Sequence, residues 1–187
     1  MNLRLRLVRV LLCLGAVVAS VTQLQAHPAP FSFVDLRIEG TRVDLQVVVH
    51  AFDVAYELGV QPPNRVLEPG GLGSRADRLG ALVDERLTVT VDGRRLVVES
   101  WSAPEPLPER QSVSLRASIE LDQAPGAVEV EAVMFPYDPA HQTFVNFYDE
   151  GALTAQAILG GEETGYQYFV GSRQGTLAVI QEFVPQG

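Results

Sequence analysis

The stretch that decides the fold lies at residues 31–50 and reads FSFVDLRIEGTRVDLQVVVH. Apolar and polar residues alternate on both sides of Gly40 and Thr41. A period of two is the pattern of a β-strand with one buried face. Two such runs separated by a short turn predict a β-hairpin. We therefore expect the domain to be built from strands, beginning with this pair.

Further strands are predicted outward from this hairpin. Leu87–Val91 and Arg95–Trp101 flank Asp92-Gly93, a dipeptide that strongly favours a hairpin turn. Another hairpin, about a turn at residues 124–126, and three shorter strands complete the set: Val113–Leu121, Val128–Phe135, Thr143–Tyr148, Ala152–Leu159 and Tyr166–Val170.

One helix is predicted within this series of strands. Apolar residues recur at helical spacing within Arg75–Arg86, and Ser74 is placed to cap the first turn. A single helical turn is predicted at Asp53–Leu58. Prolines and glycines predict a loop over Gln61–Gly73 and an extended linker over Ala103–Glu109. Together these elements predict a mostly-β fold, an antiparallel, immunoglobulin-like β-sandwich with one inserted helix.

The first 26 residues have the three parts of a secretory signal peptide. Arginines at positions 4, 6 and 9 precede the apolar run Val10–Val21, and the small residue Ala26 precedes the predicted cut. The run is short for a membrane span, which needs about 20 apolar residues. We predict a signal peptide over residues 1–26 and an exported β-rich domain over residues 27–173. An uncleaved membrane anchor is the alternative.

Charge and composition exclude several classes of function. The 187 residues carry 23 acidic and 14 basic side chains, a formal charge of −9, so the chain should repel nucleic acid and anionic lipid heads. The single cysteine, Cys13, lies in the leader, so the exported part has no disulfide, thiolate nucleophile or cysteine metal site. It also has no Gly-x-Ser-x-Gly elbow, no cofactor loop and no convergent acid–base set. We predict that the chain is not an enzyme.

The three histidines, His27, His50 and His141, are the candidate metal ligands. Cleavage after Ala26 would make His27 the first residue, whose free amine and imidazole together can chelate copper. Imidazole also suits nickel and zinc. Pro28 has no amide N–H, which excludes square-planar sites built from deprotonated amides of the first residues. The alternative is three unrelated histidines, because no tight ligand spacing joins them.

The segment at residues 134–148, MFPYDPAHQTFVNFY, gathers aromatic residues and two prolines around His141. We interpret it as a proline-ordered corner whose aromatic rings cap the core. A docking surface for another domain or for the membrane is the alternative.

Three stretches carry a resemblance to a known family. They are Ala26-His27-Pro28 after the leader, residues 135–146 (FPYDPAHQTFVN) and residues 174–187 (QGTLAVIQEFVPQG). They resemble the exported front domain of HupE/UreJ-type membrane proteins. The resemblance implies that residues 174–187 form a lead-in segment to a transmembrane region that this chain lacks. It also implies a periplasmic location, with membrane association if the protein continues past Gly187.

The resemblance implies a role in metal-ion transport, because the membrane part of the family looks like a nickel permease. The expected partner is that membrane part or a separate membrane protein, and the expected ion is nickel or another transition metal. Two alternatives stay open. One is a free-standing exported copper- or nickel-binding protein that uses His27, and the other is a purely structural interaction domain.

Overall fold

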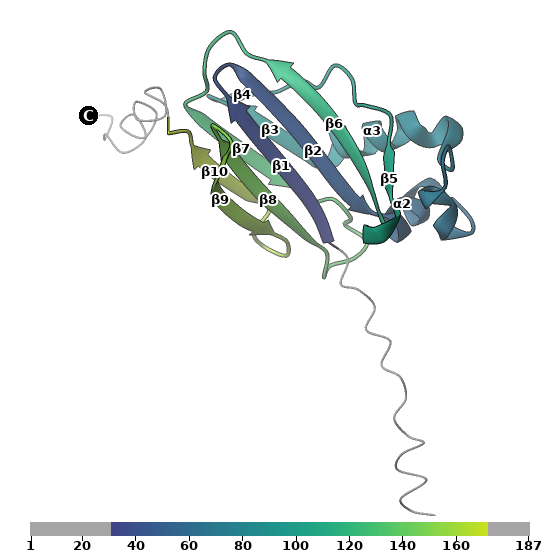
Figure 1. Cartoon of the computed structure of the whole chain (residues 1–187). Helices are drawn as coiled ribbons and strands as arrows, with labels where there is room; N and C mark the ends of the chain where they lie inside the picture. The colour runs from purple at the N-terminus through teal and green to yellow at the C-terminus, as the bar shows by residue number, and fades with distance from the viewer. Residues whose placement is uncertain (1–30, 172–187) are drawn as a thin grey trace, which may run out of the picture.

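The hairpin at residues 31–50 lies at the centre of the larger of two sheets (Figure 1). The structure is a computed structural model that describes residues 31–171. Six strands form the larger sheet in the order β5-β6-β2-β1-β8-β9. Their bounds are Phe31–Glu39 for β1, Arg42–His50 for β2, Glu105–Leu107 for β5, Ser112–Glu120 for β6, Gln142–Asp149 for β8 and Ala152–Leu159 for β9.

Four strands form the second sheet, in the order β10-β7-β3-β4. Their bounds are Leu87–Val91 for β3, Arg94–Arg95 for β4, Ala127–Ala132 for β7 and Gly165–Phe169 for β10. The two sheets pack face to face, so the predicted mostly-β sandwich with an inserted helix is confirmed.

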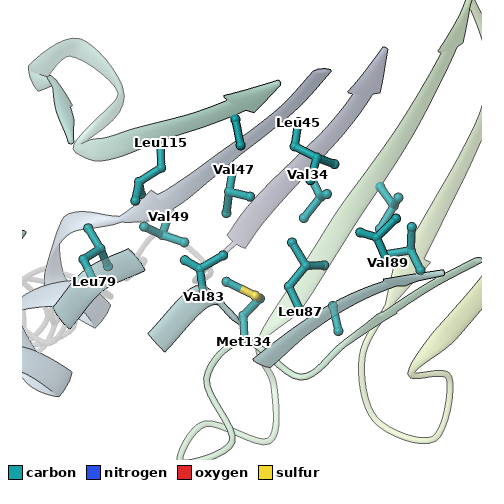
Figure 2. Close-up of a cluster of buried hydrophobic side chains, with 14 of the residues drawn as sticks. Val34, Leu45, Val47, Val49, Leu79, Val83, Leu87, Val89, Leu115 and Met134 are labelled. Carbon is teal, nitrogen blue, oxygen red and sulfur yellow. The ribbon is translucent and has the colours of Figure 1, made fainter. Parts of the chain in front are cut away.

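The core lies between the two sheets, where the alternating residues of each strand meet. Val34, Leu45 and Val47 of the larger sheet face Leu87 and Val89 of the smaller one (Figure 2). All five are at most 6 % exposed. Burial of these branched side chains is the main favourable term in folding, and it explains the period of two in the sequence.

Two helices close one end of the sandwich. The predicted helix is α3 (Ala76–Arg86), and the predicted helical turn is a full short helix, α2 (Ala51–Leu58). Ser74 does not cap α3, because it lies in a preceding 3₁₀ turn and the N-cap position is Arg75, with no side-chain cap. Leu79 and Val83 of α3 are fully buried and join the core (Figure 2).

Three strand predictions are wrong in detail. Strands β6 and β7 lie in different sheets, so the turn at residues 124–126 crosses the sandwich and makes no hairpin. Strand β4 ends at Arg95, well short of the expected Trp101, and the proline-rich linker contains the three-residue strand β5. Alternation reports which face of a strand is buried, but it does not report the neighbouring strand.

One strand pair also departs from the expected antiparallel arrangement. Strands β1 and β8 pair in parallel, with Phe31 opposite Gln142. Every other pair of strands within residues 31–171 is antiparallel. The predicted signal peptide (residues 1–26), the lead-in segment (residues 174–187) and His27 lie outside the described residues. Within the described part of the chain, no helix has the length and apolar character needed to cross a bilayer.

Candidate functional site

The register of the larger sheet brings two of the candidate histidines to one end. Strand β1 begins at Phe31, and its parallel neighbour β8 begins at Gln142, directly after His141. Strand β2 runs the other way and ends at His50. Figure 1 shows the start of β1, the end of β2 and the start of β8 at the same end of the sheet, beside α2. We call this the His141 end.

His141 is buried at this end, with both ring nitrogens directed at protein groups. Its Nε2 lies 2.9 Å from the hydroxyl of Ser32, which is fully buried in β1. The rings of His141 and Phe135 also make an edge-to-face contact, with 4.8 Å between their centroids. A cavity of about 220 Å³ adjoins His141 and is lined partly by Phe135 and Leu159.

Asp53 approaches His141 from the first turn of α2. The carboxylate is 92 % buried, and its Oδ1 accepts a 2.5 Å hydrogen bond from the hydroxyl of Tyr137. Its Oδ2 lies 3.8 Å from His141 Nδ1, which is too far for a hydrogen bond. Both of these facing atoms are buried without any hydrogen-bond partner in the structure. Unsatisfied buried polar atoms are rare in folded proteins, so a facing pair marks a candidate site.

Arg86 holds the elements of the site together. Its guanidinium donates to Glu57 of α2 at 2.8 Å and to the carbonyl oxygen of Met134 at 2.7 Å. Arg86 therefore links the end of α3 to α2 and to the corner that carries Tyr137 and His141. Hydrogen bonds from a charged donor are stronger than neutral ones, so this link fixes where Asp53 sits.

The pKa values of the site follow from burial. Desolvation lowers the pKa of His141; the carboxylates of Asp53 and Asp138 act in the opposite direction, and His50 adds a smaller lowering effect. The pKa of Tyr137 is raised, first by desolvation and then by its hydrogen bond to Asp53. His141 is thus favoured as a neutral imidazole, which has one N–H for two polar neighbours.

The ring nitrogen that carries this proton decides what faces Asp53, because the Ser32 hydroxyl can either accept from Nε2 or donate to it. With the proton on Nε2, directed at Ser32, the lone pair of Nδ1 faces the carboxylate oxygen of Asp53. Two acceptors face each other in that tautomer, so the space between them suits a cation. A neutral histidine and a carboxylate are also ordinary ligands for transition metals.

His50 shares this end of the sheet but not this cluster. It is partly exposed and stacks on the ring of Phe52, with 5.5 Å between centroids. Within residues 31–171, no three or more His, Cys, Asp or Glu side chains are placed to hold a metal together. The structure therefore places His50 near His141 without making the two a common ligand set.

Ser32, His141 and Asp53 also have the residue types of a serine-protease triad. The Ser32 hydroxyl is 0 % exposed, so no substrate carbonyl reaches it in this conformation. The His141–Asp53 separation of 3.8 Å also leaves the imidazole without the hydrogen bond that orients it in such triads. We assign Ser32 a positioning role through Nε2, and the absence of catalysis stays a prediction.

The sequence indicated His141 but not its companions. Phe135 and Phe147 are buried as the interpretation of residues 134–148 expects, but Tyr137 is 41 % exposed and the second half of the segment is strand β8, so the interpretation holds only in part. Tyr137 belongs to that segment, whereas Asp53 is 84 residues away from it in the sequence. No periodicity connects residues so far apart, and only the packing of α2 against this corner does so.

A comparison with protein-family models and with curated proteins finds no match for this chain. The fold is therefore defined by the structure itself, as a two-sheet β-sandwich with a buried His–Asp–Tyr cluster at one end. The resemblance to the HupE/UreJ family stays a prediction.

Proposed function

We propose that this chain is the exported, non-enzymatic front domain of a HupE/UreJ-like membrane protein, and that it receives a transition-metal ion, such as nickel, at the His141 end. One observation carries the proposal: His141 Nδ1 and Asp53 Oδ2 are both buried, both unpartnered and 3.8 Å apart. Bonds from one metal ion to imidazole nitrogen and to carboxylate oxygen are each about 2.1 Å, so one ion can join the two atoms.

The hydrogen bonds around the pair support this assignment. A metal-binding histidine usually donates its other ring N–H to a neighbouring acceptor, and Ser32 Oγ stands at that position. Tyr137 holds the second oxygen of Asp53 in the same way. Burial also lowers the pKa of His141, which keeps its lone pair free for an ion at neutral pH.

Two donors are too few to hold a transition-metal ion alone, so the remaining ligands have to come from elsewhere. His27 lies four residues before Phe31, which is paired with Gln142 next to His141. Four extended residues span at most about 14 Å, so the chain between His27 and Phe31 is short enough to keep the amine and imidazole of His27 near this end. We therefore propose His27 as the third contributor and His50, at the same end, as an accessory ligand.

The first test is titration of the processed protein, beginning at His27, with Ni²⁺ and separately with Cu²⁺ in a calorimeter. We expect Asp53→Asn and His141→Gln each to weaken binding at least tenfold, which corresponds to about 1.4 kcal/mol. A version with one extra alanine before His27 should lose the contribution of the free amine.

Asp149→Asn is the matched control, because Asp149 lies at the opposite end of β8 and also accepts a hydrogen bond from a tyrosine. Its metal affinity should equal that of the wild type. The proposal is abandoned if Asp53→Asn and His141→Gln both bind the two ions as tightly as the wild type does.

A further inference from the structure

The four sheet edges of the described domain are β5 and β9 of the larger sheet and β10 and β4 of the smaller one. Strand β10 has five residues and contains neither proline nor charge. Strand β5 has three residues and includes Pro106, and β4 consists of two exposed arginines. Proline, charge and shortness are the usual means by which proteins blunt an edge strand. Strand β9, at the margin of the larger sheet (Figure 1), has eight residues and contains neither proline nor charge.

Within residues 31–171, no strand is hydrogen-bonded to the outer side of β9, although β10 packs near it. The strand pairs with β8 on one side only, and it ends the strand order of its sheet. Alternate backbone N–H and C=O groups of an edge strand are free to pair with a further strand. Two large apolar side chains of β9 are also half exposed, Leu153 at 48 % and Ile158 at 54 %. An added strand would cover both kinds of group.

Acidic residues stand at both ends of this uncharged strand. Asp149 and Glu150 precede it, and Glu162 and Glu163 follow it. Residues 142–171 contain no arginine, lysine or histidine. Glu150, Glu162 and Glu163 are exposed, and none of them is in an ion pair within the described part of the chain.

This charge pattern disfavours a second copy of the chain. A two-fold antiparallel pairing of β9 with itself would set the start of each strand against the end of the other. Glu150 of one copy would then meet Glu162 and Glu163 of the other, and like charges across a strand pair are destabilising. A segment with basic residues at both ends meets opposite charges in either direction.

We propose that β9 is a strand-addition site for an extended segment of another polypeptide, uncharged over about eight residues and carrying arginine or lysine at both ends. Main-chain hydrogen bonds would give affinity, as in other cases of strand addition. The flanking carboxylates would select the partner by charge.

The test uses the full chain and a fluorescent twelve-residue peptide, (Thr-Val)₄ with two arginines at each end, followed by fluorescence anisotropy. A peptide with glutamates in place of the arginines should bind at least tenfold more weakly. A third peptide has the same arginine ends, but every amide nitrogen of its (Thr-Val)₄ part is methylated. It keeps the charge and loses the backbone donors on both of its edges, so it should not bind.

Variants of the protein then locate the site. Glu162→Lys combined with Glu163→Lys should lower the affinity for the arginine-ended peptide at least tenfold. Glu99 is an exposed acidic residue on the β4 side, and Glu99→Lys should leave the affinity for this peptide unchanged. Equal binding of the methylated peptide would overturn the proposal, since charge alone would then explain binding. So would a chain that is dimeric in sedimentation and becomes monomeric in Ile158→Lys, because the occupant would then be a second copy.

Discussion

The two ends of β8 carry the same pair of residue types in different settings. At the first end, beside His141, Asp53 accepts a hydrogen bond from Tyr137. At the last end, Asp149 accepts one from Tyr168 at 3.2 Å and another from the backbone N–H of Gly171 at 2.9 Å. The Asp149 end is partly exposed, whereas the Asp53 carboxylate is 92 % buried and leaves one oxygen unpartnered.

This difference separates a structural carboxylate from a candidate ligand. Asp149 uses one oxygen for two donors and has solvent beside it, so its hydrogen bonds explain its presence. Asp53 is removed from water at a cost that the Tyr137 hydrogen bond offsets only in part. Sites that break the rule of satisfied burial are usually functional, and the His141 end is the place in this domain where we expect function.

The largest effect on stability is expected in the core next to the Asp149 end. Phe147 is fully buried in β8 and stacks on Tyr168 with 5.0 Å between centroids. Phe147→Ala should lower the free energy of unfolding by about 3–5 kcal/mol. Urea unfolding followed by circular dichroism and by the fluorescence of Trp101, the single tryptophan, should give coincident transitions. Separate transitions would show that the ends unfold independently.

The next largest effect is expected from removing the hydroxyl of Tyr137, and removing that of Tyr168 should cost less stability. Tyr137→Phe leaves a second buried oxygen of Asp53 without a donor, so unfolding should become easier by about 1–3 kcal/mol. Tyr168→Phe should cost less than about 1 kcal/mol, because Asp149 keeps the Gly171 N–H and solvent. Urea midpoints of both variants measure the contrast. Equal losses would remove the distinction between the two ends.

Replacing the two carboxylates by amides should change the stability of the fold in opposite directions. Asp53→Asn removes a poorly compensated buried charge and keeps an acceptor for Tyr137, so stability should stay constant or rise by up to about 1 kcal/mol. Asp149→Asn weakens two hydrogen bonds to a charged acceptor and should cost about 0.5–1 kcal/mol. Thermal unfolding of the two variants compares them. A clear loss of stability in Asp53→Asn would mean that Asp53 is structural.

The smallest effect is a dependence of stability on pH. Burial lowers the pKa of His141 below its ordinary value of 6.5, so below pH 6.5 the unfolded chain takes up a proton that the folded chain resists. Stability should therefore fall as the pH is lowered from 7.5 to 5.5, and it should fall less in His141→Gln. Tyr168→Phe, at the other end of β8, should keep the wild-type dependence. Urea midpoints at the two pH values are the measurement.

Local features of the fold could be predicted from the sequence. The hairpin turn at Gly40, the turn at Asp92-Gly93 and the helix at Arg75–Arg86 all follow from patterns within a few residues, and the structure confirms them. Strand β9 matches its predicted bounds, Ala152–Leu159. These elements depend on turn chemistry and on which face is buried, and a short window of sequence holds both kinds of information.

Relations between distant segments could not be predicted. The placement of β6 and β7 in different sheets and the parallel pairing of β1 with β8 depend on how the whole chain packs. The candidate site shares this property. His141 is a candidate from the sequence because imidazole is a good metal ligand, but Asp53 and Ser32 belong to residue types that are common in any chain. They gain meaning from a contact that forms only after α2 and β1 have met the corner before β8.

The parallel pairing of β1 with β8 also has a consequence for how the protein folds. Ser32 and His141 are 109 residues apart in the sequence, so the hairpin of β1 and β2 can form from nearby residues before β8 reaches the other side of β1. Pairing across such a separation is slow, because the loop must close before its contacts form. Until then the edge of β1 that will pair with β8 is uncovered, and its phenylalanines make it prone to aggregate or to bind chaperones. The central sheet is thus completed late, and the His141 end is assembled in the same step.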